Sequence, residues 1–153
     1  MAADGSKETP LAVEAAVRLA NGTGSELHVM HVVSTVPEAP YPRSWEKEKR
    51  EAMLEWKKLR GLEFLDDLVR RIEEELGRDV AGSHYSEGTP DKEVVRLGED
   101  IGAGLIMVGG RRPKWLERIF LAGFPDKVLR RAKCPVLVVG ERGSRESPVA
   151  RRP

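Results

Sequence analysis

Hydrophobic positions along the chain follow two different periods, and their alternation predicts a series of helices and strands. Residues 9–20 place apolar side chains at steps of three and four. They follow the pair Thr9-Pro10, in which Thr9 suits the cap of a helix and Pro10 its first position. Residues 26–33 form a short run that is rich in β-branched side chains and apolar on both faces, which is typical of an interior parallel strand.

The same alternation continues through the rest of the chain. Residues 34–43 hold three prolines and are predicted to form a surface loop, because proline at that density fits neither a helix interior nor a strand ladder. A long helical pattern over residues 44–76 follows and is closed by Gly77. The later predicted elements are a weaker strand over 80–86, a helix over 90–101, a buried strand over 105–108, a helix over 124–133 and a last strand over 136–139.

This order of elements predicts a three-layer α/β/α sandwich, in which helices cover both faces of a parallel sheet. In such sheets ligands bind at the carboxyl ends of the strands, where the strand order reverses. The loops after Ala3, Val33 and Val108 are therefore the candidate positions for a binding site.

Composition narrows the classes of partner. The chain has 153 residues, which fits one domain, and its 26 basic and 25 acidic side chains leave a formal charge of only +1. That balance argues against a nucleic acid or a membrane held by bulk electrostatics. The sequence has no apolar run long enough to span a bilayer, no secretory signal and only one cysteine, Cys134, so we expect a cytoplasmic protein.

Several stretches, taken in order, resemble the universal stress protein family. They are residues 3–6, 26–32, 87–90, 104–109 and 126–139. The resemblance covers nearly the whole chain up to Val139. It implies a five-stranded parallel sheet of the adenine-nucleotide-hydrolase-like, Rossmann-like kind, with the domain over residues 1–140. The composition of residues 141–153, rich in Gly, Ser, Pro and Arg, predicts a flexible tail.

The resemblance also implies a function and an assembly. Members of the family act in stress response, and those that bind ATP hold it without obligatory turnover. Many are homodimers in which the last strands of two subunits pair, which points here to Val136, Leu137, Val138 and Val139. We therefore expect a dimeric, non-catalytic module with unknown protein partners.

The family's nucleotide site can be carried over residue by residue. An aspartate after the first strand meets the adenosine end, which corresponds to Asp4, and a residue at the end of the second strand packs on adenine, which corresponds to Val32. The phosphate loop of the family has the form G-x-x-G followed nine residues later by G-[S/T]. The candidate nucleotide-binding residues are Asp4, Val32, Gly109, Arg111, Arg112, Ala122, Gly123 and Phe124.

The phosphate loop departs from the family pattern at three of its four positions. Gly109 matches the first glycine, but Arg112 and Ala122 replace the other glycines and Gly123 replaces the hydroxyl residue. Glycines let backbone N–H groups close on phosphate, so these changes predict a degenerate loop with weak or lost nucleotide binding. The alternative is a sensor of ATP, with Mg²⁺, or of AMP, in which arginine side chains of a basic loop grip the phosphates.

The first strand is unusually short. Only Met1, Ala2 and Ala3 precede Asp4, although the strand in this place is expected to be central in the sheet. Loss of a central strand would leave backbone N–H and C=O groups of both neighbouring strands unpaired or bonded to water. We therefore hypothesise that the given start lies inside the true first strand.

Other candidate residues favour structural roles. His28 and His31 lie three residues apart on a strand and point to opposite faces, so they are not expected to chelate a metal, and His84 stands alone on the weak strand. Cys134 is predicted to be a small buried apolar residue. The tryptophans are predicted to pack between helices or at an interface; they are Trp45, Trp56 and Trp115. Neither a nucleophile elbow nor a Walker-type phosphate loop occurs, so no catalytic or metal-binding residue is predicted.

Overall fold

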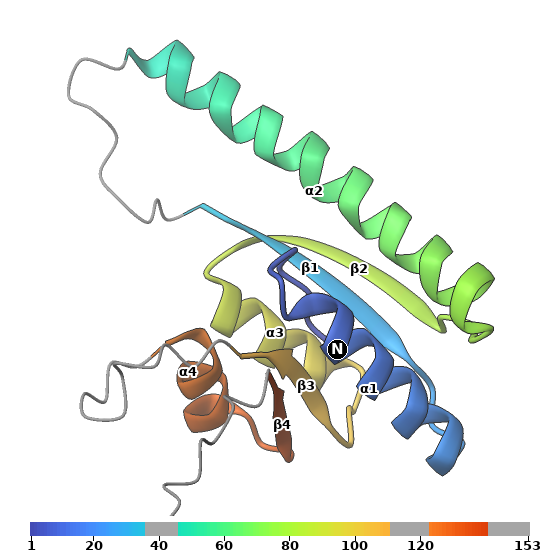
Figure 1. Cartoon of the computed structure of the whole chain (residues 1–153). Helices are drawn as coiled ribbons and strands as arrows, with labels where there is room; N and C mark the ends of the chain where they lie inside the picture. The colour runs from blue at the N-terminus through green and yellow to red at the C-terminus, as the bar shows by residue number, and fades with distance from the viewer. Residues whose placement is uncertain (36–45, 111–122, 141–153) are drawn as a thin grey trace, which may run out of the picture.

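The computed structural model describes residues 1–35, 46–110 and 123–140. Helices and strands alternate along this part of the chain (Figure 1). Their bounds are α1 Thr9–Thr23, β1 His28–Ser34, α2 Lys47–Leu76, β2 Gly82–Gly88, α3 Pro90–Asp100, β3 Ile106–Gly109, α4 Phe124–Arg131 and β4 Val136–Val139. Each predicted element in the described part is present, with its ends shifted by a few residues. The predicted proline loop and the predicted tail over 141–153 fall largely or wholly outside it.

Helix α1 begins one residue earlier than the sequence pattern predicts. Its cap residue is Glu8, without a side-chain hydrogen bond to the backbone, and Thr9 is already helical and buried. The prediction that Thr9 caps the helix is therefore wrong: its hydroxyl donates to Asp4 Oδ1 instead, at 3.2 Å. The helix ends at Thr23, where Gly24 takes a left-handed conformation at φ 65° that suits glycine.

The strands are parallel, as predicted. β1 pairs with β2, and β3 pairs with β4. The N-terminal residues join these two pairs, because Ala2 forms parallel bridges to Met30 of β1 and to Val108 of β3. The structure thus has two strand pairs linked at Ala2, in the order β2, β1, Ala2, β3, β4, where the resemblance predicts five full strands. The short segment 1–3 lies in the centre, where the first strand was expected.

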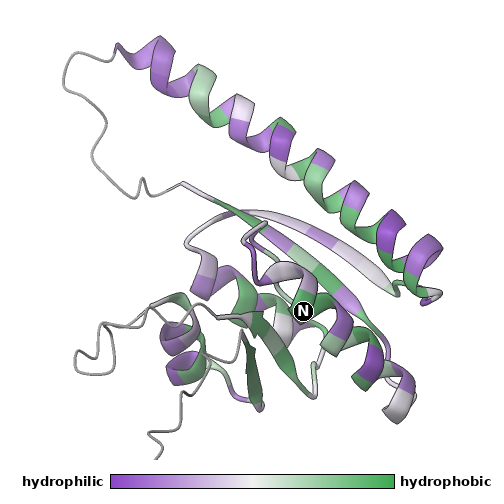
Figure 2. Cartoon of the chain, viewed as in Figure 1, coloured by the Kyte–Doolittle hydropathy of each residue, from purple (hydrophilic) through white to green (hydrophobic). Residues whose placement is uncertain are grey.

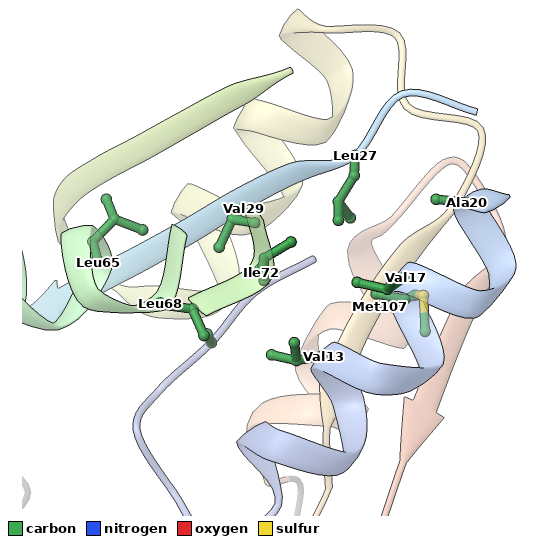
Figure 3. Packing of buried hydrophobic residues seen from close by; sticks show 11 residues of the cluster. Val13, Val17, Ala20, Leu27, Val29, Leu65, Leu68, Ile72 and Met107 are labelled. Atoms are coloured by element: carbon green, nitrogen blue, oxygen red, sulfur yellow. The ribbon is translucent and has the colours of Figure 1, made fainter. Parts of the chain in front are cut away.

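One hydrophobic core lies between the strands and the helices α1 and α2. Val13 and Val17 of α1 and Ile72 of α2 belong to one buried cluster with Val29 of β1. Figure 3 shows these side chains pointing toward one another from the two helices and the strand. Ile72 and Val29 are fully buried, so this cluster anchors the C-terminal half of α2 to the sheet.

A second core lies on the opposite face. Val94 of α3 and Val128 of α4 pack with Met30 of β1 and Val108 of β3. Successive residues Val29 and Met30 thus face different cores, because side chains alternate along a strand. The predicted three-layer arrangement is confirmed in this respect: helices cover both faces of the strands.

Helix α2 is amphipathic, and its N-terminal half runs beyond the strands (Figures 1 and 2). Its buried positions begin only at Gly61, in the middle of the helix, and continue to Ile72. Trp56 has 57% of its surface exposed, so it does not pack within this chain as one of the two predictions for it required; its role at an interface stays a prediction. Among the described helices, none combines the length and the apolar character needed to cross a membrane.

Candidate functional site

The three loops that the sequence predicts as candidate binding positions all begin at the same end of the sheet, at the carboxyl ends of its strands. Segment 1–3, β1 and β3 run in parallel beside one another, so their carboxyl ends lie together. Asp4 follows segment 1–3, Thr35 follows β1 and Gly110 follows β3. Because the strand order reverses around Ala2, this edge is the place where a parallel α/β sheet binds ligands.

Asp4 lies in a tight turn that leads into α1. Its Oδ1 atom accepts hydrogen bonds from the backbone N–H of Ser6, at 2.9 Å, and from the hydroxyl of Thr9, at 3.2 Å. Gly5 has φ +75°, a left-handed conformation that favours glycine. The turn therefore fixes one carboxylate oxygen of Asp4 while the residue as a whole stays exposed. Asp4 thus lies directly after the central segment 1–3, and its contact with the adenosine end stays a prediction.

His31 contacts Ala3, the residue that precedes this turn, and this contact was not predicted from the sequence. Its Nδ1 atom lies 2.8 Å from the carbonyl oxygen of Ala3, and its ring meets Phe64 of α2 edge to face, with 4.9 Å between the centroids. A Cβ on Gly61 would lie 3.0 Å from the His31 ring and 2.7 Å from Val33. The helix can approach this closely only with glycine at position 61. A glycine inside a long helical pattern was the sequence signal for this contact.

Val32 lies near the carboxyl end of β1 and is half-buried against the second core. Its neighbour in the strand register is Ser86 of β2, whose hydroxyl donates to Glu93 at 2.7 Å. Hydrogen bonds from Ser86 and from the Arg96 guanidinium lower the pKa of Glu93. Val32 is thus flanked by a polar network on the α3 side of the sheet.

Gly109 ends β3 next to a residue that the sequence analysis did not consider. Glu8 is 7% exposed, and a Cβ on Gly109 would lie 3.6 Å from the Cβ of Glu8. The buried acid is at the N-terminus of α1, where the helix dipole stabilises negative charge. An acidic residue therefore packs beside the end of β3, where the predicted phosphate loop starts. No motif in the sequence indicated this, because residues 8 and 109 meet only through the fold.

The far end of the predicted loop is described only from Gly123. Gly123 caps α4 with an extended backbone, φ −66° and ψ 176°. Among the described residues, a Cβ there would meet only Pro125, at 3.8 Å. Phe124 is half-buried against the second core. Arg111, Arg112 and Ala122 lie outside the described residues, as does Lys114.

Two predictions about the histidines and the cysteine can be compared with the structure. His84 is not isolated as predicted: its Nε2 atom lies 3.0 Å from Nδ1 of His28 on the neighbouring strand. Cys134 is a free, half-buried thiol beside the second core, in line with an apolar packing role. His28 and His31 have different partners on the two faces of β1, as expected.

Comparison with known proteins agrees with the resemblance noted in the sequence. A model of the universal stress protein family matches residues 1–140. The universal stress protein MJ0531 of Methanocaldococcus jannaschii is 33% identical over 138 residues, which cover 89% of this chain and 77% of that protein. The universal stress protein YxiE of Bacillus subtilis is 30% identical over 147 residues, covering 91% of this chain and 95% of its own length.

Solved structures show the same fold. A universal stress protein family member from Burkholderia pseudomallei superposes with a TM-score of 0.66 at 26% identity, over 90% of this chain and 91% of the other. A family protein from Arabidopsis thaliana with AMP bound has a TM-score of 0.60 at 19% identity, over 94% and 84% of the two chains. The second likeness is one of fold.

Proposed function

The chain belongs to the universal stress protein family, and from this we infer a non-catalytic stress-response module whose nucleotide site has kept its adenosine end and weakened its phosphate grip. In this proposal ATP binds weakly or not at all. The position of Glu8 beside Gly109 carries the inference.

Two features weaken the phosphate end in this proposal. Glu8 is an acidic residue buried next to Gly109, and in this proposal its charge disfavours a phosphate at the start of the loop. In addition, the loop has Arg112, Ala122 and Gly123 where the family pattern has two glycines and a hydroxyl residue. A loop without those glycines closes less readily on phosphate oxygens.

The adenosine end has better support. Asp4 is exposed at the carboxyl edge of the sheet, and the turn that holds one of its oxygens leaves the other for a ligand hydroxyl. Val32 offers an apolar side chain on the neighbouring strand. The Arabidopsis family member has AMP bound. AMP carries one phosphate group and therefore needs fewer contacts from a phosphate loop than ATP does.

A nucleotide sensor is the second candidate function. In it, Arg111, Arg112 and Lys114 supply the phosphate grip through side chains. The observation that favours it is the adenine nucleotide found in a protein of the same fold. The two candidates differ in whether the triphosphate adds to affinity.

Thermal unfolding with added ligand separates them. A ligand at one hundred times its dissociation constant stabilises a protein by about 2.7 kcal/mol, which raises the melting temperature measurably. We expect adenosine or AMP to raise it at least as much as ATP with Mg²⁺ at equal concentration, or none of the three to raise it. A clearly larger rise with ATP and Mg²⁺ contradicts a weakened phosphate grip and favours the sensor.

The proposed module is a homodimer joined through β4. This strand pairs with β3 on one side, and Leu137 and Val138 are 41% and 40% exposed. An exposed apolar strand is a ready template for pairing with another chain. A second copy of β4 would cover it.

A further inference from the structure

A pair of histidines lies near the amino ends of β1 and β2, at the opposite end of the strands from the candidate nucleotide site. His28 is the first residue of β1, and His84 is the third residue of β2. The register aligns His28 with Gly82 and Met30 with His84, so both imidazoles project from the face that α3 covers. Because these are the amino ends of the strands, the pair is separate from the candidate nucleotide site (Figure 1).

The two rings meet nitrogen to nitrogen. Nδ1 of His28 and Nε2 of His84 are 3.0 Å apart, while the ring centroids are 5.3 Å apart and the ring planes differ by 25°. The difference between these two distances is close to the sum of two ring radii, so both nitrogens lie near the line between the centroids. The rings therefore share one proton edge to edge and are not stacked face on face.

Gly82 provides the space in which these nitrogens meet. A Cβ at this position would lie 2.7 Å from Nδ1 of His28 and 2.8 Å from Nε2 of His84. Both distances are shorter than a real Cβ contact, so any other residue would push the rings apart. The glycine leaves open the point on which two nitrogen ligands converge.

A carboxylate lies on the side of His28 that faces away from His84. Oε2 of Glu26 is 3.6 Å from Nε2 of His28, beyond hydrogen-bond distance but close enough to favour a proton on that nitrogen. Nδ1 then keeps its lone pair and faces His84. A carboxylate behind a histidine is the usual arrangement in metal sites, where it orients the ring and makes the other nitrogen a better donor.

We propose that His28 and His84 chelate a borderline divalent transition metal ion of the Zn²⁺ type. Nitrogen–zinc bonds of about 2.0–2.1 Å in tetrahedral geometry place two ligand nitrogens about 3.3 Å apart, close to the observed separation. Both rings turn so that their lone pairs meet at the ion, and the proton on Nε2 of His84 moves to its Nδ1 atom. Water completes the coordination.

The site is expected to be weak and exchangeable. Within residues 1–35, 46–110 and 123–140, no group of three or more His, Cys, Asp or Glu side chains is arranged around a metal position. Two protein ligands hold Zn²⁺ less tightly than the four of a structural site. The pair is therefore suited to a metal that binds and leaves, and protons compete with it.

The first test uses Zn²⁺ on the whole chain with Cys134→Ser, so that its only cysteine does not bind the metal. Long-range ¹H–¹⁵N spectra can resolve the ring nitrogens of all three histidines. We expect saturable shifts of His28 and His84 together, with His31 unchanged because it contacts Ala3 on the opposite face. Equal shifts of all three, shifts of His31 alone, or no shift would overturn the proposal.

Calorimetric titration of variants provides a second test. His84→Gln should abolish saturable Zn²⁺ binding, and Glu26→Gln should weaken it by about tenfold, the usual effect of removing an outer-shell partner. His31→Gln is the matched control, because it removes a histidine and leaves the pair intact. Equal Zn²⁺ affinity of the Cys134→Ser parent and its His84→Gln derivative would rule the site out. The spectra of the parent decide the matter if a histidine variant does not fold.

Discussion

At the scale of single residues, Glu8 has the clearest consequence for ligand binding. It is buried against Gly109 at the N-terminus of α1. We expect Glu8→Gln to tighten the binding of AMP and ATP by about tenfold, because it removes a negative charge from a residue that packs beside Gly109, at the start of the predicted phosphate loop. Isothermal titration of both proteins with the two nucleotides measures the change.

Glu14→Gln is the control for this prediction. Glu14 lies on the same helix but is exposed and pairs with Arg18, four residues along the helix. The Glu14→Gln change removes the same charge at a position away from the predicted loop. An equal gain in both variants would mean that net charge, and not the place of Glu8, controls the affinity.

His84 predicts how stability depends on pH. Burial, the neighbouring His28 and the Met1 amino group lower the pKa of His84 below its ordinary value of 6.5. The unfolded chain therefore takes up a proton at His84 at a higher pH than the folded chain does. This contribution to stability is complete above pH 6.5 and is lost as the pH falls through 6.5 toward the folded-state pKa.

Urea unfolding at pH 7.5 and at pH 5.5 measures this effect. We expect the loss of stability between the two pH values to be smaller in His84→Gln than in the original protein. Comparison of the two proteins removes the contribution of the Met1 amino group, whose pKa burial lowers from 8.0 to about 6. The same loss in both proteins would show that other groups control the pH dependence.

Residues at the site differ in how far the sequence could reveal them. Asp4 was identified through the family resemblance, and the structure places it directly after segment 1–3; its role in binding stays a prediction. Glu8 and Gly109 are far apart in sequence, as are His28 and His84, and no local pattern links them. Such pairs depend on which strands become neighbours.

At the scale of elements, the packing of α2 on β1 depends on one glycine. A Cβ at Gly61 would lie 2.7 Å from Val33 and 3.0 Å from His31. We expect Gly61→Ala to destabilise the fold by about 1–3 kcal/mol through overpacking, although alanine is the better helix former. Chemical denaturation gives the difference in the free energy of unfolding.

Gly22→Ala is the matched comparison within a helix. A Cβ at Gly22 of α1 has no atom within 4 Å, and its φ is not positive. The same substitution should therefore stabilise the protein by roughly 0.5–1 kcal/mol, the usual gain from replacing a helical glycine by alanine. Two changes of the same sign would argue against close packing as the cause at Gly61.

The loop between β3 and α4 gives a second prediction at this scale. We expect the triple change Arg112→Gly, Ala122→Gly and Gly123→Ser to increase ATP affinity, because it restores the family's pattern of glycines and hydroxyl. In the described part of the chain, only Pro125 lies within 4 Å of a Cβ at position 123, at 3.8 Å. No gain in calorimetric titration, even combined with Glu8→Gln, would mean that the loop sequence does not limit binding.

At the scale of the whole molecule, the exposed face of β4 predicts assembly. We expect light scattering to give twice the chain mass at micromolar concentration. Leu137→Lys should give a monomer, because it places a charge in the proposed joint between subunits. Leu19→Lys is the control, since Leu19 is 38% exposed on α1, compared with 41% for Leu137. A monomeric mass for the unaltered protein would contradict the proposed dimer.

The sequence alone determined the order of elements, the parallel strands, the helices on both faces of the sheet and the family. These follow from local periodicity and from short motifs, which act over a few residues. The tertiary structure decided what those patterns leave open. It showed that residues 1–3 link the two strand pairs, that Glu8 packs beside Gly109 at the start of the predicted phosphate loop, and that His28 meets His84. The reason is physical: these contacts join residues that only strand order and register bring together.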